Sequence, residues 1–126
     1  LDALLPRVDA LVLALPLSDD THHLFDARRI ALVKRGAWIV NVGRGALVEE
    51  TALVAALQSG QLGGAGLDVF EVEPLPPASP LWTMPNVIVT PHNSGDSLGN
   101  QVRAAEIFLD NLARFGRGEA LRNEVA

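Results

Sequence analysis

The sequence predicts an α/β protein: the carboxyl-terminal half of a doubly wound parallel sheet, followed by a long helix. Four short apolar runs are continuous rather than alternating, which is typical of strands buried on both faces of a parallel sheet. Helical patterns separate the first three runs, which indicates βαβ units with right-handed crossovers. Near the end of the chain, apolar residues recur at helical spacing and predict the final helix.

The predicted strands take up the apolar runs, at residues 11–15, 38–42, 66–70 and 87–90. Before the first strand, residues 1–8 look like the end of a helix. Five prolines within residues 74–85 exclude a helix interior and a central strand, because proline lacks an amide hydrogen. We therefore expect an ordered loop before the fourth strand.

Three helices are expected. The first begins near Asp26, a good N-cap residue, and stops at Gly36. The second covers residues 50–59 and stops at Gly60. The third covers residues 97–115 and carries the amphipathic stripe.

Composition excludes several classes of protein. The 126 residues are 48% apolar and carry 15 acidic against 10 basic side chains, a net charge of −5. This content is too apolar for a disordered chain, and the negative charge argues against a nucleic-acid or anionic-membrane surface. The longest apolar run is far shorter than the ~20 residues of a membrane span. Because there is no cysteine, we expect a cytoplasmic protein without disulfides or thiolate metal sites.

The chain is expected to be a piece of a longer protein. It begins at Leu1, its only methionine is Met84, and it contains no G-x-G-x-x-G turn of the kind that holds a dinucleotide pyrophosphate. We divide it into a partial binding domain over residues 1–96 and a helix with its tail over residues 97–126, which would return toward an absent substrate domain.

Chemically useful side chains follow each predicted strand. Ligands bind such sheets outside the carboxyl ends of the strands, and Arg44, Asp68, Glu73 and His92 all fall there. An arginine can hold a carboxylate through two parallel hydrogen bonds. A histidine beside a carboxylate can exchange a proton with a substrate oxygen while hydride is transferred. Glycines that would let a flat ligand approach the backbone are Gly43, Gly45 and Gly95.

Three motifs carry a resemblance to a known family. Residues 40–48 are VNVGRGALV, residues 64–74 are GAGLDVFEVEP, and residues 86–92 are NVIVTPH. In this order and spacing they resemble the Rossmann-type NAD-binding domain of the D-isomer-specific 2-hydroxyacid dehydrogenases. The resemblance implies hydride transfer between NAD(P)H and a small 2-oxo acid in a homodimeric parent protein. It does not distinguish NAD from NADP, and NAD is taken as the first choice.

The resemblance also implies roles for individual residues. Arg44 matches the arginine that orients the substrate carboxylate, His92 the acid/base, and Glu73 its carboxylate partner. Asp68 matches the acid that faces the nicotinamide, with Val42 and Gly43 as backbone neighbours. The implied cofactor-binding residues are Pro16, Thr21, Val42, Gly43, Arg44, Asp68, His92, Ser94 and Gly95.

Several simpler roles compete with these. Glu71 is an alternative partner for His92, but its spacing to Pro74 favours Glu73 and leaves Glu71 as a solvated loop acid. Asp68 could brace its strand end. Adjacent residues rarely bind one ion, so we expect a solvated loop rather than a metal site at His22 and His23, and no metal site elsewhere. The tryptophans are expected to be packing residues, Trp38 and Trp82.

The function has one alternative from another class. Some relatives of the family are corepressors that bind NAD(H) and act by binding other proteins, and they can keep the same arginine, glutamate and histidine. For the enzyme we expect a small 2-oxo or 2-hydroxy acid as partner, no nucleic acid and no membrane. The isolated chain is expected to be inactive, because the pyrophosphate-binding turn is missing.

Overall fold

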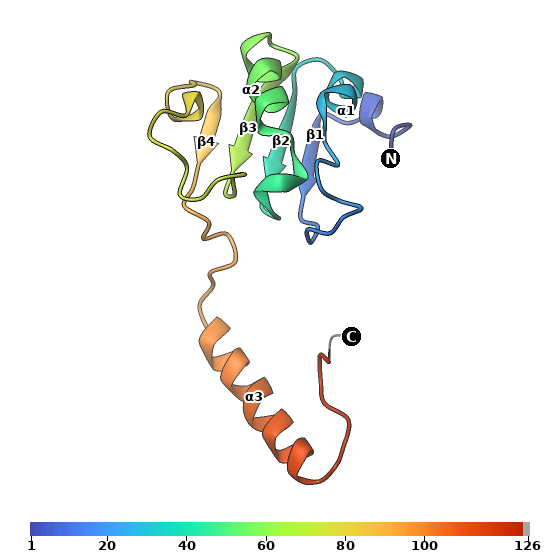
Figure 1. Cartoon of the computed structure of the whole chain (residues 1–126), viewed down its shortest axis with the longest axis vertical. Helices are drawn as coiled ribbons and strands as arrows, with labels where there is room; N and C mark the ends of the chain where they lie inside the picture. The colour runs from blue at the N-terminus through green and yellow to red at the C-terminus, as the bar shows by residue number, and fades with distance from the viewer. Residues whose placement is uncertain (125–126) are drawn as a thin grey trace. The chain divides into compact units, whose positions relative to one another are not determined.

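The computed structural model describes residues 1–124 and separates the chain into two units, Leu1–Ser94 and Gly95–Ala126. The predicted tail extends to residue 126, and its last two residues lie outside the described ones. The first unit contains a four-stranded parallel sheet in the order β1-β2-β3-β4, which confirms the predicted sheet (Figure 1). The strands are β1 (Ala10–Leu13), β2 (Ala37–Asn41), β3 (Leu62–Leu67) and β4 (Val87–Val89).

The predicted position of the third strand, residues 66–70, is wrong. β3 starts at Leu62, and three of its six residues are glycines, which lack the side chains that signal a strand. The structure gives a reason for one of these glycines. A Cβ atom at Gly64 would lie 2.5 Å from the Trp38 ring, so only glycine leaves room for that ring on the neighbouring strand.

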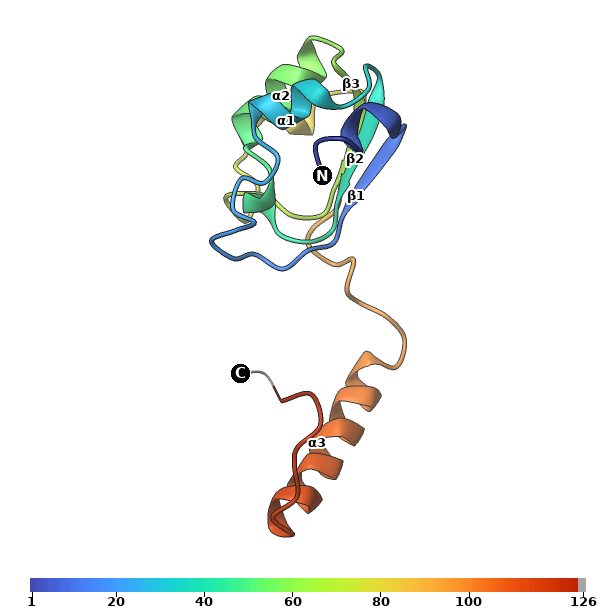
Figure 2. The same cartoon turned by 90° about the vertical axis from the view of Figure 1, so that its right-hand side faces the viewer.

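Two helices, α1 (Ala27–Leu32) and α2 (Glu50–Gln58), lie on the same face of the sheet (Figure 2). Asp26 caps α1 as predicted, since its carboxylate accepts a hydrogen bond from the Arg29 amide at 2.8 Å. The predicted stop at Gly36 is wrong, because α1 ends at Leu32. The side-chain amide of Gln61 donates through Nε2 to the Val33 carbonyl at 2.8 Å. In a longer helix this carbonyl would accept a hydrogen bond within the helix instead.

Short 3-10 turns complete the first unit: η1 (Leu5–Arg7), η2 (Gly45–Leu47) and η3 (Pro80–Trp82). At residues 1–8, where the end of a helix was predicted, the structure has only the 3-10 turn η1. The predicted loop at residues 74–85 contains η3. α2 ends within a residue of the prediction.

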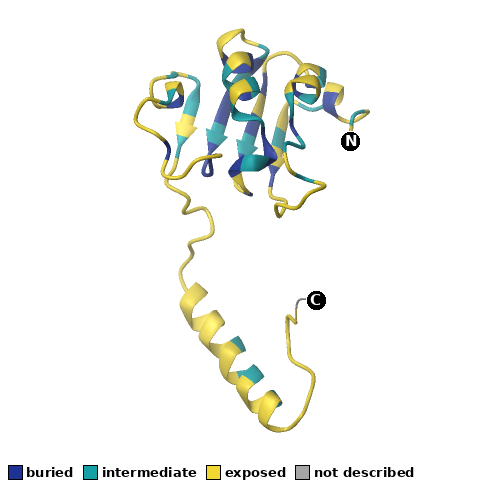
Figure 3. Ribbon diagram, viewed as in Figure 1, coloured by how far each residue is buried: buried dark blue, intermediate teal, exposed yellow. Residues whose placement is uncertain are grey.

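The core lies between the sheet and the two helices, where the strands are most deeply buried (Figure 3). The prediction that the strands are buried on both faces is wrong for this chain. Val12, Trp38 and Ile88 share the opposite face, as their register shows, and all three are exposed. Since both helices lie on one face, the alternate side chains of each strand face no helix of the first unit.

The second unit contains α3 (Asn100–Gly116). α3 begins three residues later than predicted. The residue before it, Gly99, has a left-handed φ of 88°, which a helix cannot contain. No residue of α3 is buried, and its apolar stripe is exposed at Val102, Phe108, Leu112 and Phe115. Among residues 1–124, no helix is both long enough and apolar enough to cross a membrane.

Candidate active site

The turn after β2 presents Arg44. Asn41, which is 1% exposed, donates through Nδ2 to the Arg44 carbonyl at 2.9 Å and accepts at Oδ1 from the Gly43 amide at 3.1 Å. Gly45 lies against the loop after β3, because a Cβ there would be 1.9 Å from the Phe70 backbone. The Arg44 side chain is exposed, and its Nη1 donates to the Gly43 carbonyl at 2.7 Å.

Asn41 is a positioning residue that the sequence interpretation missed. Its signal was a single amide side chain at the end of an apolar strand, directly before glycine and arginine. A buried polar group needs hydrogen-bond partners, and here both partners belong to the turn that carries Arg44.

Asp68 follows β3 and braces the loop that carries His92. Its carboxylate is 3% exposed and accepts hydrogen bonds from the Thr90 hydroxyl at 2.5 Å, the Asn93 amide at 3.0 Å and the Ser94 amide at 2.8 Å. His92 itself has a φ of 54°, a left-handed conformation that is uncommon for residues other than glycine and persists where neighbours enforce it. The two amides bound by Asp68 directly follow His92, so the carboxylate fixes this turn.

The ionisation of Asp68 reflects these bonds. Burial by itself raises the pKa of this carboxyl group, but the hydrogen bonds from Ser94, Thr90 and Asn93 outweigh burial and hold the pKa well below its usual value. Asp68 is therefore a buried, ionised anchor. The geometry gives it the bracing role, which is compatible with contact to a cofactor.

Glu73 and His92 form a close pair. Glu73 Oε2 lies 2.6 Å from His92 Nδ1, and Glu73 Oε1 accepts from the Phe70 amide at 3.0 Å. Each carboxylate oxygen thus has its own partner, which fixes the plane of the carboxylate and the ring. Among residues 1–124, no hydrogen bond occupies Nε2 of His92, so this nitrogen is available to a ligand.

The charge of Glu73 is also favoured. Burial raises the pKa of Glu73, yet the hydrogen bonds from His92 and Phe70, with the positive charges of His92 and Arg44, lower it below its usual value. Arg44 is therefore close enough to influence the pair electrostatically. The three residues follow neighbouring strands of the sheet, β2, β3 and β4, and Glu73 and His92 are in direct contact.

The other predicted cofactor-binding residues lie in the loops that follow the strands. Thr21 closes the loop after β1 by donating to the Pro16 carbonyl at 2.8 Å and accepting from the Ser18 amide at 2.8 Å. Val42 is exposed beside the buried Gly43. Gly95 is the first residue of the second unit.

Glu71 is an exposed loop acid, as we expected, but it has partners in the structure. Its Oε1 lies 2.7 Å from His23 Nε2 and accepts from the Glu50 amide at 3.3 Å, so it ties the loop after β1 to the start of α2. His23 and His22 stack with ring centroids 4.0 Å apart, and His22 is exposed in a loop whose residues 14–20 are exposed too. Among the described residues, no group of three acidic, histidine or cysteine side chains could hold a metal ion.

A cavity of about 730 Å³ opens beside the Glu73–His92 pair. Its walls come from the loop after β3, from η3 and from the end of β4. Trp82 lines it and is 52% exposed, so the interpretation of this residue as simple packing is wrong. The lining residues are Phe70, Glu73, Pro74, Leu75, Trp82, Val89, Thr90, Pro91 and His92.

The residues that follow the strands fit the nicotinamide ring of a cofactor. The turn that would bind the cofactor's phosphates is not among the described residues. Leu15 and Val42 are exposed apolar side chains that follow neighbouring strands, and a flat ring can lie against them. Asp68 follows the next strand. No glycine-rich turn leads into a helix among residues 1–124 in the way that pyrophosphate binding requires.

These features define a class: a parallel α/β domain whose strand ends carry an arginine and a histidine–glutamate pair. Residues 1–94 match the family described as D-isomer specific 2-hydroxyacid dehydrogenase, NAD binding domain, and the chain belongs to this family. The match confirms the resemblance inferred from the motifs and the expected NAD-binding fold.

A curated relative is glyoxylate/hydroxypyruvate reductase B of Citrobacter koseri, which is 47% identical over 123 residues. The match covers 98% of this chain and 38% of that protein, so the chain spans less than half the length of its curated relatives.

Solved structures of the same family are also similar to this chain. A D-isomer specific 2-hydroxyacid dehydrogenase from Xanthobacter autotrophicus Py2, in complex with NADPH and MES, matches with a TM-score of 0.92 and 45% identity, over 99% of this chain and 51% of that one. An NADPH-dependent glyoxylate/hydroxypyruvate reductase from Sinorhizobium meliloti, in complex with NADP and sulfate, matches with a TM-score of 0.89 and 44% identity, over 98% and 40%.

Proposed function

We propose that this chain is the catalytic half of an NAD(P)-dependent reductase of small 2-oxo acids, here called the parent protein. The observation that carries the proposal is the Glu73–His92 pair, with Nε2 of His92 available to a ligand and Arg44 beside it. The curated reductase relative supports the choice of substrate class.

The roles of the residues follow from their geometry. Arg44, held by its own turn, binds the substrate carboxylate and orients the 2-oxo group. His92 donates a proton from Nε2 to the carbonyl oxygen during reduction and takes it back in the reverse direction. Glu73 contacts the ring at Nδ1 and so holds its orientation, which leaves Nε2 to the substrate. The cofactor, when bound, supplies or accepts the hydride.

The comparisons remove the reason to place NAD before NADP. The sequence interpretation placed NAD first, but the two solved relatives described above hold NADPH or NADP. These relatives give NAD no advantage, so the proposal takes NADPH as the first cofactor to test. Neither the pyrophosphate-binding turn nor a residue that selects the adenosine ribose lies among the motifs of this chain.

The test is NADPH or NADH oxidation by the parent protein with glyoxylate, pyruvate and hydroxypyruvate. We expect turnover that disappears in His92→Ala, and no turnover by the isolated 126-residue chain. Cofactor binding without turnover on any 2-oxo acid would contradict the enzyme and favour the corepressor-like alternative. Turnover by the isolated chain would contradict its expected inactivity.

A homodimeric parent and a cytoplasmic location belong to the same proposal. The lack of cysteine supports an environment without disulfide formation. Light scattering of the purified parent protein tests the dimer, and fractionation of the source cells tests the location.

A further inference from the structure

The cavity beside His92 is larger than a two- or three-carbon acid needs. Its volume of about 730 Å³ falls within the range of pockets that enclose whole organic ligands, roughly 300–1,000 Å³. Of the two residues proposed to bind the carboxylate and the 2-oxo group, His92 lines the cavity and Arg44 does not, so the space inside the cavity has no assigned occupant.

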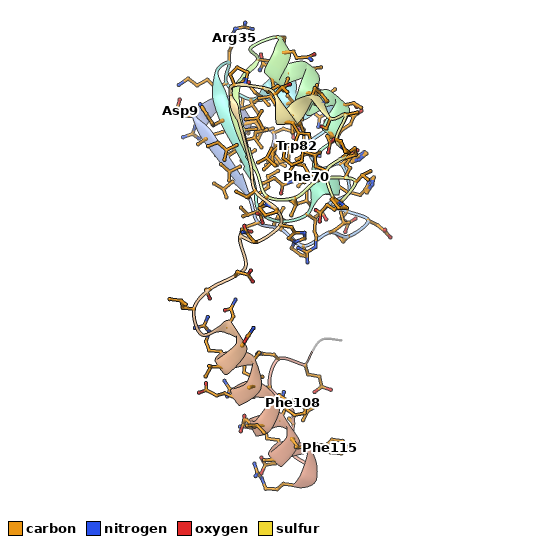
Figure 4. The ribbon with its side chains drawn as sticks, turned by 90° about the vertical axis from the view of Figure 1, so that its left-hand side faces the viewer. Asp9, Arg35, Phe70, Trp82, Phe108 and Phe115 are labelled. Carbon is orange, nitrogen blue, oxygen red and sulfur yellow. The ribbon has the colours of Figure 1, made fainter. Side chains whose placement is uncertain are left out.

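The walls of the cavity are mainly apolar. Phe70 and Leu75 are almost fully buried behind it, and Val89 and Pro91 bring apolar surface from β4 and the residues after it. Figure 4 shows Phe70 and Trp82 in the same part of the first unit. Apart from the Glu73–His92 pair and Thr90, whose hydroxyl is bound to Asp68, every residue that lines the cavity is apolar.

The side chain of Trp82, which forms part of the cavity wall, is fixed by a hydrogen bond. Its indole Nε1 donates to the Pro76 carbonyl at 3.0 Å, and η3, which ends at Trp82, is capped by the Ser79 side chain. The ring is nevertheless half exposed. An aromatic surface that is fixed in place and still accessible loses little conformational entropy when it contacts a ligand.

We infer that this cavity binds an apolar side chain of the substrate, so that the preferred substrates are 2-oxo acids with a branched aliphatic or phenyl group. The inference rests on the proposed function and deepens it. Burial of such a group against Trp82, Phe70 and Leu75 removes apolar surface from water, whereas a methyl group would leave most of the cavity unfilled.

The experiment compares substrates in the parent protein with saturating NADPH. kcat/KM is measured for pyruvate, 4-methyl-2-oxopentanoate and phenylpyruvate. We expect kcat/KM for the larger acids to exceed that for pyruvate by at least about 10-fold, the scale on which hydrophobic pockets discriminate. Trp82→Ala should lower the ratio of phenylpyruvate to pyruvate by about 10-fold, mainly through KM, and Trp82→Phe should restore part of it.

Trp38→Phe is the matched control, because Trp38 is also half exposed but lies in the sheet away from the cavity lining. It should leave the substrate ratio unchanged. If pyruvate is reduced but the larger acids are not preferred, or if both Trp82 variants keep the wild-type ratio, this inference is overturned while the proposed function stands. If no 2-oxo acid is reduced, the proposed function itself fails.

Discussion

Two histidine–glutamate pairs use the same short segment of the first unit, and only one of them has the surroundings of an acid/base site. His92 pairs with Glu73 at 2.6 Å, and His23 pairs with Glu71 at 2.7 Å. Both histidines have a left-handed φ, 54° and 47°. Both pairs are partly exposed, with side-chain exposures of 44% and 35% against 38% and 30%.

The pairs differ in their neighbours. Glu73 has Arg44 nearby and borders an apolar cavity, whereas Glu71 lies beside another acid, Glu50. Burial raises the pKa of Glu50, and the negative charge of Glu71 raises it further. A short histidine–carboxylate contact therefore does not define a catalytic pair. What distinguishes the Glu73–His92 pair is the positive charge of Arg44 nearby and the apolar cavity that the pair borders.

The largest expected effect is the loss of turnover in His92→Ala of the parent protein. Removing the proton donor should lower kcat by ~10²-fold or more, the usual contribution of a positioned general acid. His23→Ala is the matched control, and it should keep kcat within about 3-fold because His23 only ties two loops together. Steady-state kinetics with hydroxypyruvate measure both. Similar losses in the two variants would remove the distinction between the pairs.

Arg44→Ala should give the next effect, a fall in kcat/KM of about 10²-fold that appears mainly as a higher KM. The guanidinium binds a carboxylate through two parallel hydrogen bonds, and an ammonium group cannot reproduce that geometry. Arg44→Lys should therefore recover only part of the loss. An unchanged KM for every 2-oxo acid would show that Arg44 does not bind the substrate carboxylate. Kinetics over a substrate series provide the measurement.

The sequence identified the residues of the first pair but not the second pair. Arg44, Glu73 and His92 follow strand ends, and parallel strands bring their carboxyl ends to one edge, so their proximity follows from topology. The His23–Glu71 contact joins two loops that are 48 positions apart. No periodicity or motif specifies which loop side chains meet, because that depends on the loop paths.

The errors in the predicted fold have similar causes. β3 was misplaced because its glycines, of which Gly64 makes room for Trp38, lack the side chains that signal a strand. α1 was predicted too long because Gln61, far away in sequence, binds the Val33 carbonyl. In both cases a tertiary contact overrides a local signal, whereas Asp26, a local N-cap, was predicted correctly.

Asp68→Asn should reduce the free energy of unfolding of the chain by about 1–3 kcal/mol near neutral pH, because the amide NH₂ that replaces one carboxylate oxygen cannot accept the bond which that oxygen receives from the loop after β4. The pKa of Asp68 is lower in the folded chain than its usual 3.8, so the folded state favours the ionised form. This stabilisation is fully present above the usual pKa and is lost as the pH falls from there toward the lowered pKa.

Urea unfolding at several pH values checks this prediction. Wild type should lose stability on acidification below about pH 4, and Asp68→Asn should lose less over the same interval. Asp20→Asn, in the exposed loop after β1, is the control and should follow wild type. Equal acid sensitivity of wild type and Asp68→Asn would contradict the bracing role, and so would an intact free energy of unfolding in the variant.

The smallest expected effect concerns the second pair. A double-mutant cycle of His23→Ala and Glu71→Gln, read as the free energy of unfolding, should give a coupling of about 0.2–1 kcal/mol, since both side chains are about one third exposed. Added salt should reduce the coupling because it screens exposed charges. Glu50→Gln should raise stability slightly at neutral pH, because it removes a negative charge beside Glu71 while its side-chain carbonyl can still accept from the Glu71 amide. A coupling well above about 2 kcal/mol would mean that the His23–Glu71 pair is far more than a surface tie, and the contrast between the two pairs would then rest on Arg44 and the cavity alone.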